Sequence, residues 1–397
     1  MISNPRIIQV ADVNAAMQEI GAVGACGAGV RAMANKAIHL LIRLDQVPSI
    51  GANIIKQEML SKGGECAVSK GTVDLSDPTT SVLLMGTVKQ YRMLIDKLKL
   101  QQFKLPAIAK ELEAVVLRGK GYNPLPLTIR DREFAWGSRS YIMGILNITP
   151  DSFSDGGRYE DPDAAINRAL AMVAEGADII DVGAESSRPG YAKLTQNEEE
   201  KRLFPILEQL VERVTVPISV DTRKSEVARK ALDMGASMIN DISGLVDDVE
   251  LVQVAAATGA PLIIMHNRDQ AVYGDLMGEI LWDLREKVAK AIAAGVQDSQ
   301  IIIDPGIGFG KTPEHNLVVM GKLDQLQSLG YPILVGPSRK SFIGKVLDLP
   351  VNQRLEGTAA AVTLSITLGA DIIRVHDVQA MKRVALMTDA MLGRLGG

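Results

Sequence analysis

Polar and charged side chains stand directly after short apolar runs throughout residues 141–397. They are carboxylates, amides, hydroxyls and cations: Asn147, Asp181, Asp221, Asn240, Asp241, His266, Asp304, Ser338, Arg339, Lys340, Ser341, Arg374 and His376. The carboxylates Asp221 and Asp304 suit the amino groups of a planar heterocycle, because carboxylates pair well with amino-pyrimidine edges. Asn240 and Lys340 add further donors and acceptors. The spacing therefore predicts a binding site for such a heterocycle.

A second set of side chains suits an anion. Arg374 and His376 follow the last apolar run, and Asn147 follows the first. In a closed ring of strands the first and last strands are neighbours, so these three side chains would lie together. Two donors beside a carboxamide suit a phosphate or diphosphate, with Asn147 as a Mg²⁺ ligand.

Several of these residues have a simpler structural explanation. Asp181 and Asp241 could each cap the turn that follows them. Lys311 ends a glycine-rich stretch and could be a surface charge, since the spacing of a P-loop is not met. The glycine-rich residues 24–29 also lack the spacing of a dinucleotide-binding loop.

The apolar runs themselves predict the fold. They occupy residues 141–146, 178–180, 216–220, 237–239, 261–265, 301–303, 332–335 and 371–375. Amphipathic stretches separate them, for example residues 163–175, 224–234 and 354–368. Continuous apolar strands alternating with helices indicate parallel strands covered by helices. Eight units within residues 141–397 match the roughly 250 residues of a (β/α)₈ TIM barrel, with an open doubly wound sheet as the alternative.

The preceding residues predict a separate α/β part. Within residues 1–120, strands are expected at 7–10, 37–44 and 82–85, and helices at 13–20, 50–60, 89–100 and 107–117. This is a small N-terminal α/β domain whose role the sequence leaves open. Residues 121–140 predict a linker and a hairpin that plugs the closed bottom of the barrel.

Composition excludes several classes of function. The formal net charge is −4 and no Lys/Arg run occurs, so a nucleic-acid footprint is absent. No apolar run approaches the roughly 18–20 residues that span a bilayer, and the N-terminus does not resemble a signal peptide. The two cysteines, Cys26 and Cys66, fit no metal-ligand spacing. A cytoplasmic protein with small-molecule substrates, no nucleic-acid partner and no membrane partner is expected.

Seven short motifs in order carry a family resemblance. Residues 146–157 read LNITPDSFSDGG, residues 181–190 read DVGAESSRPG, and residues 304–311 read DPGIGFGK. The pieces VDT at 220–222, IND at 239–241, SRK at 338–340 and RVHD at 374–377 complete the set. Together they resemble the dihydropteroate synthases, a family of pterin-binding (β/α)₈ barrels, here in a long form with an N-terminal extension.

The resemblance implies a reaction and a role for each matching residue. The reaction joins 6-hydroxymethyl-7,8-dihydropterin diphosphate to 4-aminobenzoate in folate biosynthesis, with Mg²⁺ as cofactor, and family members are commonly homodimers. The implied pterin-binding residues are Asp221, Asn240, Met265, Asp304, Phe309, Gly336, Arg339 and Lys340. Asn147, Arg374 and His376 would hold the diphosphate, with Mg²⁺ on Asn147. Phe153, Ser187, Pro189 and Ser341 would line the aminobenzoate pocket, and Asp155 and Arg188 would meet as two loops close. The implied catalytic residues are Asn147, Asp155, Arg188, Lys340, Arg374 and His376.

Two departures and two alternatives accompany this prediction. The run Met265-His266-Asn267 replaces the family's usual Met-His-Met, and Ser187 stands where Thr is common. A methyltetrahydrofolate-type methyltransferase shares such a pterin-binding barrel, but it needs no diphosphate grip. A non-catalytic pterin-binding regulator would not need the complete set of anion-binding side chains.

Overall fold

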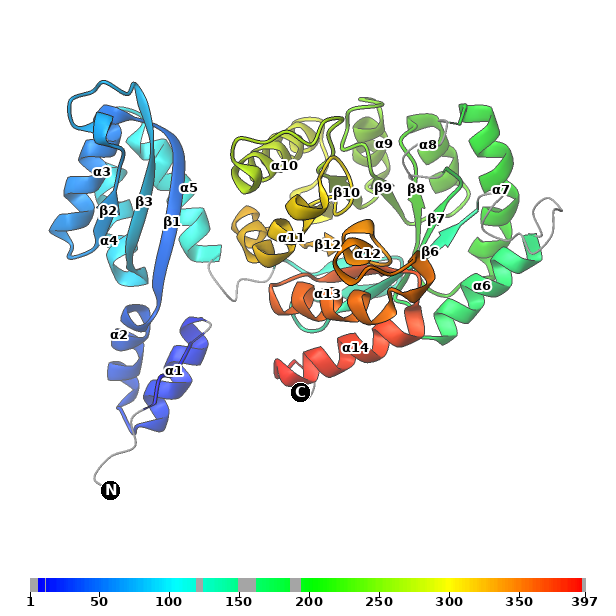
Figure 1. The fold of residues 1–397 in the computed structure, drawn as a ribbon, viewed down its shortest axis with the longest axis horizontal. Coiled ribbons are helices and arrows are strands. Elements are labelled where there is room, and N and C mark those ends of the chain that lie inside the picture. The colour runs from blue at the N-terminus through cyan, green and yellow to red at the C-terminus, as the bar shows by residue number, and fades with distance from the viewer. Residues whose placement is uncertain (1–5, 11, 119–123, 149–161, 186–193, 395–397) are drawn as a thin grey trace. The chain divides into compact units, whose positions relative to one another are not determined.

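The computed structural model describes residues 6–10, 12–118, 124–148, 162–185 and 194–394. The chain divides into two compact units, residues 1–122 and 123–397 (Figure 1). Within the described residues, no helix is both long enough and apolar enough to span a membrane.

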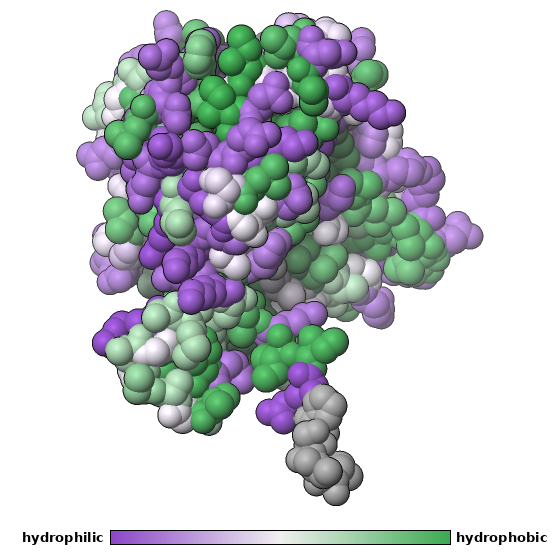
Figure 2. Space-filling model, turned by 90° about the vertical axis from the view of Figure 1, so that its left-hand side faces the viewer, coloured by the Kyte–Doolittle hydropathy of each residue, from purple (hydrophilic) through white to green (hydrophobic). Residues whose placement is uncertain are grey.

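The N-terminal unit contains a three-stranded antiparallel sheet in the order β1-β3-β2, formed by β1 (His39–Pro48), β2 (Glu65–Ala67) and β3 (Thr79–Thr87). Its helices are α1 (Val13–Ala22), α2 (Gly27–Ala37), α3 (Ser49–Ser61), α4 (Val88–Leu98) and α5 (Leu105–Arg118), with one 3₁₀ turn, η1 (Lys70–Thr72). Side chains of β3 alternate between buried and more exposed positions, so one face packs on a core that includes Ile55, Leu84 and Leu94. The other face carries exposed residues such as Leu41. On the side that Figure 2 presents, hydrophilic and hydrophobic residues are interspersed.

One prediction for this unit is wrong, and two elements were not predicted. Residues 7–10 form no strand, and Ile7 is 94% exposed, because an apolar run becomes a strand only where a neighbouring strand pairs with it. Residues 27–37 form α2 where the sequence analysis placed no helix, since Ala34 packs into the core and offsets the weak helix propensity of the glycines. The short strand β2 was also not predicted.

The second unit is a closed barrel of eight parallel strands. They are β6 (Tyr141–Asn147), β7 (Ile179–Gly183), β8 (Ile218–Asp221), β9 (Met238–Asp241), β10 (Leu262–Met265), β11 (Ile301–Asp304), β12 (Leu334–Val335) and β13 (Ile372–Val375). Their order is β11-β10-β9-β8-β7-β6-β13-β12, and a parallel bridge between Ile303 and Ile333 closes the ring. The prediction of a (β/α)₈ barrel preceded by a small α/β part is confirmed, and the open doubly wound sheet is excluded.

Helices surround the ring of strands (Figure 1). They are α6 (Pro162–Ala174), α7 (Gln196–Arg213), α8 (Ser225–Asp233), α9 (Leu251–Thr258), α10 (Leu276–Ala293), α11 (Pro313–Gly321), α12 (Ser341–Leu347), α13 (Leu355–Thr367) and α14 (Val378–Met391), with 3₁₀ segments η2 (Asp298–Gln300), η3 (Leu323–Leu329) and η4 (Val351–Gln353). Thr195 and Thr312 begin α7 and α11 with capping boxes, which satisfy the first free N–H groups of each helix. The largest apolar cluster lies between these helices and the strands.

A hairpin fills one end of the barrel interior. Strands β4 (Leu127–Ile129) and β5 (Arg132–Phe134) pair antiparallel, and Phe134 and Trp136 cluster with inward-facing strand residues such as Met143 and Ile179. The hairpin precedes β6, so it lies at the N-terminal ends of the strands. It therefore plugs this end of the barrel, and the candidate residues lie at the opposite end.

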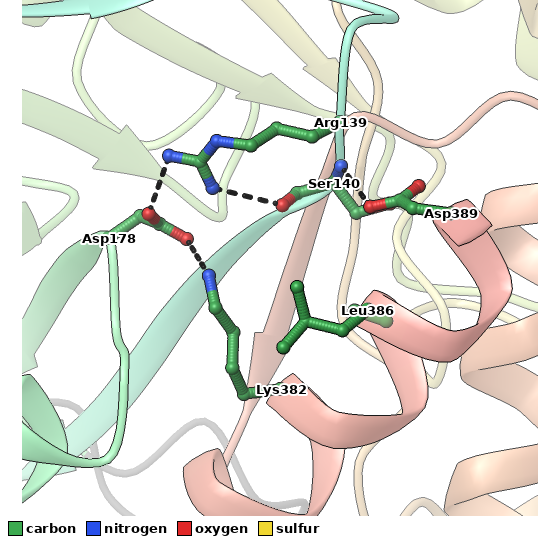
Figure 3. A pocket seen from close by; sticks show the side chains of 7 residues that line it. Arg139, Ser140, Asp178, Lys382, Leu386 and Asp389 are labelled. Carbon is green, nitrogen blue, oxygen red and sulfur yellow. Dashed lines mark hydrogen bonds and ion pairs between the residues drawn. The ribbon is translucent and has the colours of Figure 1, made fainter. Parts of the chain in front are cut away.

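A cavity of about 270 Å³ also lies at the N-terminal ends of the strands, beside α14 (Figure 3). Its charges pair with one another. The Asp178 carboxylate accepts from Arg139 Nη2 at 2.8 Å, from Lys382 Nζ at 3.1 Å and from the backbone N–H of Ile142 at 2.8 Å. Asp389 accepts from the backbone N–H and the hydroxyl of Ser140. The cluster ties β6, β7 and α14 together.

Loss of the Asp178 carboxylate is expected to destabilise the barrel by about 2–4 kcal/mol, because Asp178→Ala leaves the Ile142 N–H and two cations without their acceptor. The free energy of unfolding from urea denaturation measures the loss. Lys345→Ala serves as the control, since its ion pair with Glu314 is exposed and worth at most about 1 kcal/mol. Equal losses in the two variants would contradict the structural role of Asp178.

Candidate functional site

The functional side chains gather at the C-terminal ends of the barrel strands, where active sites of this fold lie. Strand register brings neighbours together: Asp221 pairs with Asn240 between β8 and β9, and Met265 pairs with Asp304 between β10 and β11. Strand β13, which carries Arg374, pairs with β6, which ends at Asn147. The predicted adjacency of the first and last strands is confirmed.

One guanidinium links two of the strand ends. Arg374 Nε donates to Asp181 Oδ2 at 2.6 Å, and Arg374 Nη2 donates to Asp221 Oδ2 at 2.9 Å. Asp181 Oδ2 also accepts from Asn240 Nδ2 at 3.1 Å. The Asp181 side chain is fully buried, and those of Asp221 and Arg374 are 11% and 16% exposed. Two carboxylates therefore share one cation in a nearly dry environment.

The buried position of these carboxylates shifts their pKa values. Burial raises the pKa of Asp221 to about 7, with the attraction of Arg374 opposing the shift and repulsion by Asp181 adding to it. Burial also raises the pKa of Asp304 to about 6, although its hydrogen bond from the Gly306 N–H and the charge of Lys340 oppose it. Both carboxylates thus exchange protons near neutral pH. Such a shift is typical of functional sites.

Lys340 stands over an aromatic ring beside these carboxylates. Its Nζ lies 4.2 Å from the centre of the Phe309 ring, an attractive cation–π arrangement. Burial and the nearby Arg374 charge lower the pKa of Lys340 to about 8. Gly308 has a φ of +84°, and a Cβ there would stand 2.8 Å from Lys340 Cδ. The glycine is therefore required for the loop to approach Lys340.

The loop after β11 is held by a residue that sequence reasoning set aside. Lys311 Nζ lies 2.8 Å from His266 Nδ1 and donates to the carbonyl oxygens of Gly306 and Phe309, each at 3.1 Å. Burial lowers the pKa of Lys311 to about 7. The interpretation of Lys311 as a surface charge is wrong, because two loops distant in sequence enclose it. Nothing in the local sequence pattern signals this contact.

Asp181 and Asp241, both interpreted as possible turn caps, differ in their hydrogen-bond partners. Asp241 does cap its turn, since it accepts from the N–H and hydroxyl of Ser243 and from the N–H of Leu245. Asp181 contacts Asn240 and Arg374 across the barrel instead. Its place at the end of an apolar strand was the only sequence signal for such a role.

The remaining candidates lie around this centre. His376 Nδ1 lies 3.0 Å from Ser338 Oγ, and burial together with Arg374 lowers the pKa of His376 to about 3, so it is neutral. Arg339 is engaged by both carboxylate oxygens of Asp377. Met265 is buried next to Gly306, Gly336 lies against Arg374, and Ser341 begins α12 at an exposed position.

Five candidates lie outside the described residues: Phe153, Asp155, Ser187, Arg188 and Pro189. Glu185, which precedes the second of these loops, is described and receives a hydrogen bond from Lys224 Nζ at 2.9 Å. Lys224 also contacts the buried Glu199 of α7. Glu185 is thereby tied to the start of α8 and to α7.

Comparison with known proteins defines the class. Residues 143–376 match the family model described as pterin binding enzyme. A dihydropteroate synthase of Clostridium beijerinckii is 50% identical over 269 residues, covering 68% of this chain and all of that one. A probable bifunctional folylpolyglutamate synthase/dihydropteroate synthase of Halobacterium salinarum is 40% identical over 358 residues, 88% of this chain and 42% of that protein. The solved dihydropteroate synthase of Xanthomonas albilineans with 4-aminobenzoic acid is 38% identical, covers 68% of this chain and 98% of that one, and has a TM-score of 0.65.

The chain therefore belongs to the dihydropteroate synthase family of pterin-binding enzymes. The prediction of an enzyme, a transferase of this activity, is confirmed, and neither the methyltransferase nor the non-catalytic regulator is favoured. The resemblance read from the seven motifs is confirmed as well.

Proposed function

We propose that the chain joins 6-hydroxymethyl-7,8-dihydropterin diphosphate to 4-aminobenzoate, giving 7,8-dihydropteroate and diphosphate. The reaction is a dissociative substitution at the C-terminal ends of the barrel strands. The observation that carries the proposal is the junction at Arg374. This residue contacts Asp221 of the heterocycle-binding set (Asp221, Asn240, Asp304 and Lys340). It also belongs to the anion-binding set (Asn147, Arg374 and His376), and its strand, β13, pairs with β6, which ends at Asn147. A single substrate carrying both a pterin and a diphosphate fits that juxtaposition.

The pterin edge would meet acceptors on one side and a donor on the other. Asp304 and Asn240 accept hydrogen bonds from ring amino and imino groups, and Lys340 donates to ring oxygen and nitrogen atoms. Met265, which is 1% exposed, supplies an apolar surface for the ring. Phe309 holds the ammonium of Lys340 in place. These contacts orient the methylene carbon that reacts.

The bond between the methylene carbon and the diphosphate oxygen breaks first, and the electron pair leaves with the diphosphate. Arg374 offers positive charge to the leaving oxygens, and neutral His376 offers a hydrogen bond. The carbocation left behind is stabilised by the buried carboxylates Asp221 and Asp304. The neutral arylamine nitrogen then forms the new C–N bond and loses a proton, so no nucleophilic side chain is needed.

Magnesium is proposed as the cofactor. Among the described residues, no group of three or more His, Cys, Asp or Glu side chains could hold a metal. Asn147 supplies one half-buried carboxamide oxygen at the anion-binding set. This donor set fits Mg²⁺, which takes few protein ligands and keeps waters and substrate phosphate oxygens. When bound, Mg²⁺ would supply neutralising charge to the diphosphate.

A three-component turnover assay tests the proposal. Diphosphate release should require the pterin diphosphate, 4-aminobenzoate and Mg²⁺ together, with dihydropteroate formed in equal amount. Omission of any one component is the matched control. Diphosphate release that ignores the aminobenzoate, or methyl transfer to a corrinoid, would overturn the proposed reaction.

The pH profile of kcat/KM for the pterin diphosphate should be bell-shaped. Asp304 and Asp221 act as carboxylates, so activity should fall as pH drops below about 6 to 7. Lys340 acts as an ammonium, so activity should fall as pH rises above about 8. Lys340→Arg should remove the alkaline limb from this profile if Lys340 is its origin. An alkaline limb unchanged in Lys340→Arg would assign it to another group.

Two further proposals concern assembly and location. The first is that the chain is cytoplasmic, a reducing compartment in which Cys26 and Cys66 stay free thiols. The second is that it forms a homodimer, as the family resemblance implies. Light scattering after size exclusion should give twice the 42.6 kDa of one chain. A mass of one chain would contradict the dimer.

A further inference from the structure

Asp181 is a fully buried carboxylate to which neither the heterocycle-binding set nor the anion-binding set assigns a role. It lies on β7, while its partners lie on β9 and β13. A single oxygen, Oδ2, accepts from both Asn240 Nδ2 and Arg374 Nε. We propose that Asp181 is a positioning residue, which sets the orientation of the Asn240 carboxamide and of the Arg374 guanidinium for the proposed reaction.

The first consequence concerns Asn240. A carboxamide can be turned to present either its oxygen or its nitrogen. Asp181 accepts from Asn240 Nδ2, and this hydrogen bond fixes which way the carboxamide is turned. Asn240 Oδ1 is then buried without a hydrogen-bond partner among the described residues. An unpaired buried acceptor costs free energy until a donor reaches it. Asn240 is thereby set to accept from an N–H group of the substrate.

The second consequence concerns Arg374. Its Nε is taken by Asp181 and its Nη2 by Asp221, which holds the guanidinium plane at two points. The remaining N–H groups stay available to an anion. Without the Asp181 carboxylate, the guanidinium would keep only its hydrogen bond to Asp221 and lose the one at Nε. Asp181 thus keeps the cation shared between the pterin side and the anion side of the site.

The third consequence concerns the protonation of Asp221. Charged groups from several parts of the barrel act on Asp221: Arg374 on β13, Asp181 on β7, Glu199 on α7, Asp241 on β9 and Lys340 just before α12. Of the three carboxylates that raise the pKa of Asp221, Asp181 has the largest effect. Removal of its charge should move the acid limb of the pH profile to lower pH. A purely structural role for Asp181 would leave that limb in place.

Asp181→Asn in the full chain is the test, because the variant keeps the shape and removes the charge. The value of kcat/KM for the pterin diphosphate should fall about 30- to 1000-fold, the loss expected for weakening two charge-assisted hydrogen bonds. The KM for 4-aminobenzoate should change less than about threefold, and the acid limb should move to lower pH. Asp241→Asn is the matched control, since Asp241 is an equally buried strand-end aspartate whose oxygens cap its own turn. It should lower stability and leave kcat/KM near that of the wild type, and it should move the acid limb less than Asp181→Asn does, because Asp241 raises the pKa of Asp221 less than Asp181 does.

The inference rests on the proposed function, and the experiment separates the two. A wild-type chain that makes no dihydropteroate sinks the proposed function. If the wild type turns over while Asp181→Asn stays within about twofold of it in every constant, the positioning role is wrong. Asp181→Ser, which leaves room for a bridging water, is the second variant. Unfolding of both Asp181 variants beside a folded Asp241→Asn would assign Asp181 to the fold alone and overturn the proposal.

Discussion

Arg374→Ala is expected to lower kcat/KM for the pterin diphosphate by about 10³-fold or more. In the proposed reaction the guanidinium supplies charge to the leaving group, and loss of one such preorganised donor typically costs about 10²- to 10³-fold. The variant also leaves Asp181 and Asp221 buried without their shared cation, which adds to the loss. Steady-state kinetics of diphosphate release measure it.

Arg229→Ala is the control for this experiment, because Arg229 pairs with Glu226 on the exposed side of α8, where each side chain is 47% exposed. Its kinetics should equal those of the wild type. Binding of a pterin that lacks the diphosphate should weaken less in Arg374→Ala than binding of the diphosphate substrate. An Arg374→Ala enzyme within tenfold of the wild type would remove Arg374 from the leaving-group step.

Lys340→Met is expected to weaken binding of the pterin about 10- to 100-fold, the loss expected for a hydrogen bond from a charged donor. Methionine retains an unbranched apolar chain against Phe309 and lacks the ammonium. Because the loss falls on the heterocycle, pterin with and without the diphosphate should weaken by similar factors. Isothermal titration calorimetry with both ligands measures the two losses.

Lys345→Met is the matched control on α12, the helix that follows Lys340, since Lys345 is 59% exposed and pairs with the exposed Glu314. It should bind both ligands as the wild type does. A Lys340→Met loss confined to the diphosphate ligand would move Lys340 from the pterin to the anion. Retention of full affinity for both would remove it from the site.

The barrel could be predicted because each strand is a nearly continuous apolar run, as in residues 301–303, and such runs need cover on both faces. The N-terminal unit was predicted less well, because tertiary packing decided which of its short segments form strands or helices. Residues 7–10 have the composition of a strand but have no strand to pair with. Residues 27–37 form α2 because Ala34 packs into the core. The hairpin of β4 and β5 pairs two strands that are adjacent in sequence, so a short local segment is enough to indicate it.

The candidate site also contains residues that the sequence indicated and contacts that only the structure revealed. Asp221, Asn240 and Asp304 were found because each directly follows an apolar strand, and strand ends at one rim face the same space. Asp181 met the same rule, yet a turn cap explained it equally well. Lys311 was assigned to the surface because its partner His266 lies 45 residues away in sequence. No spacing rule reports a contact between two loops.

The sequence by itself determined the strands, the residues at their C-terminal ends and, through seven ordered motifs, the family. These properties are local, because a strand and the residue after it depend on neighbours along the chain. Only the tertiary structure decided that Arg374 is shared by Asp181 and Asp221, that His376 is neutral and that Lys311 contacts His266. Those properties depend on distances across a closed ring and on exclusion of water, and both arise only when strands far apart in sequence are packed together.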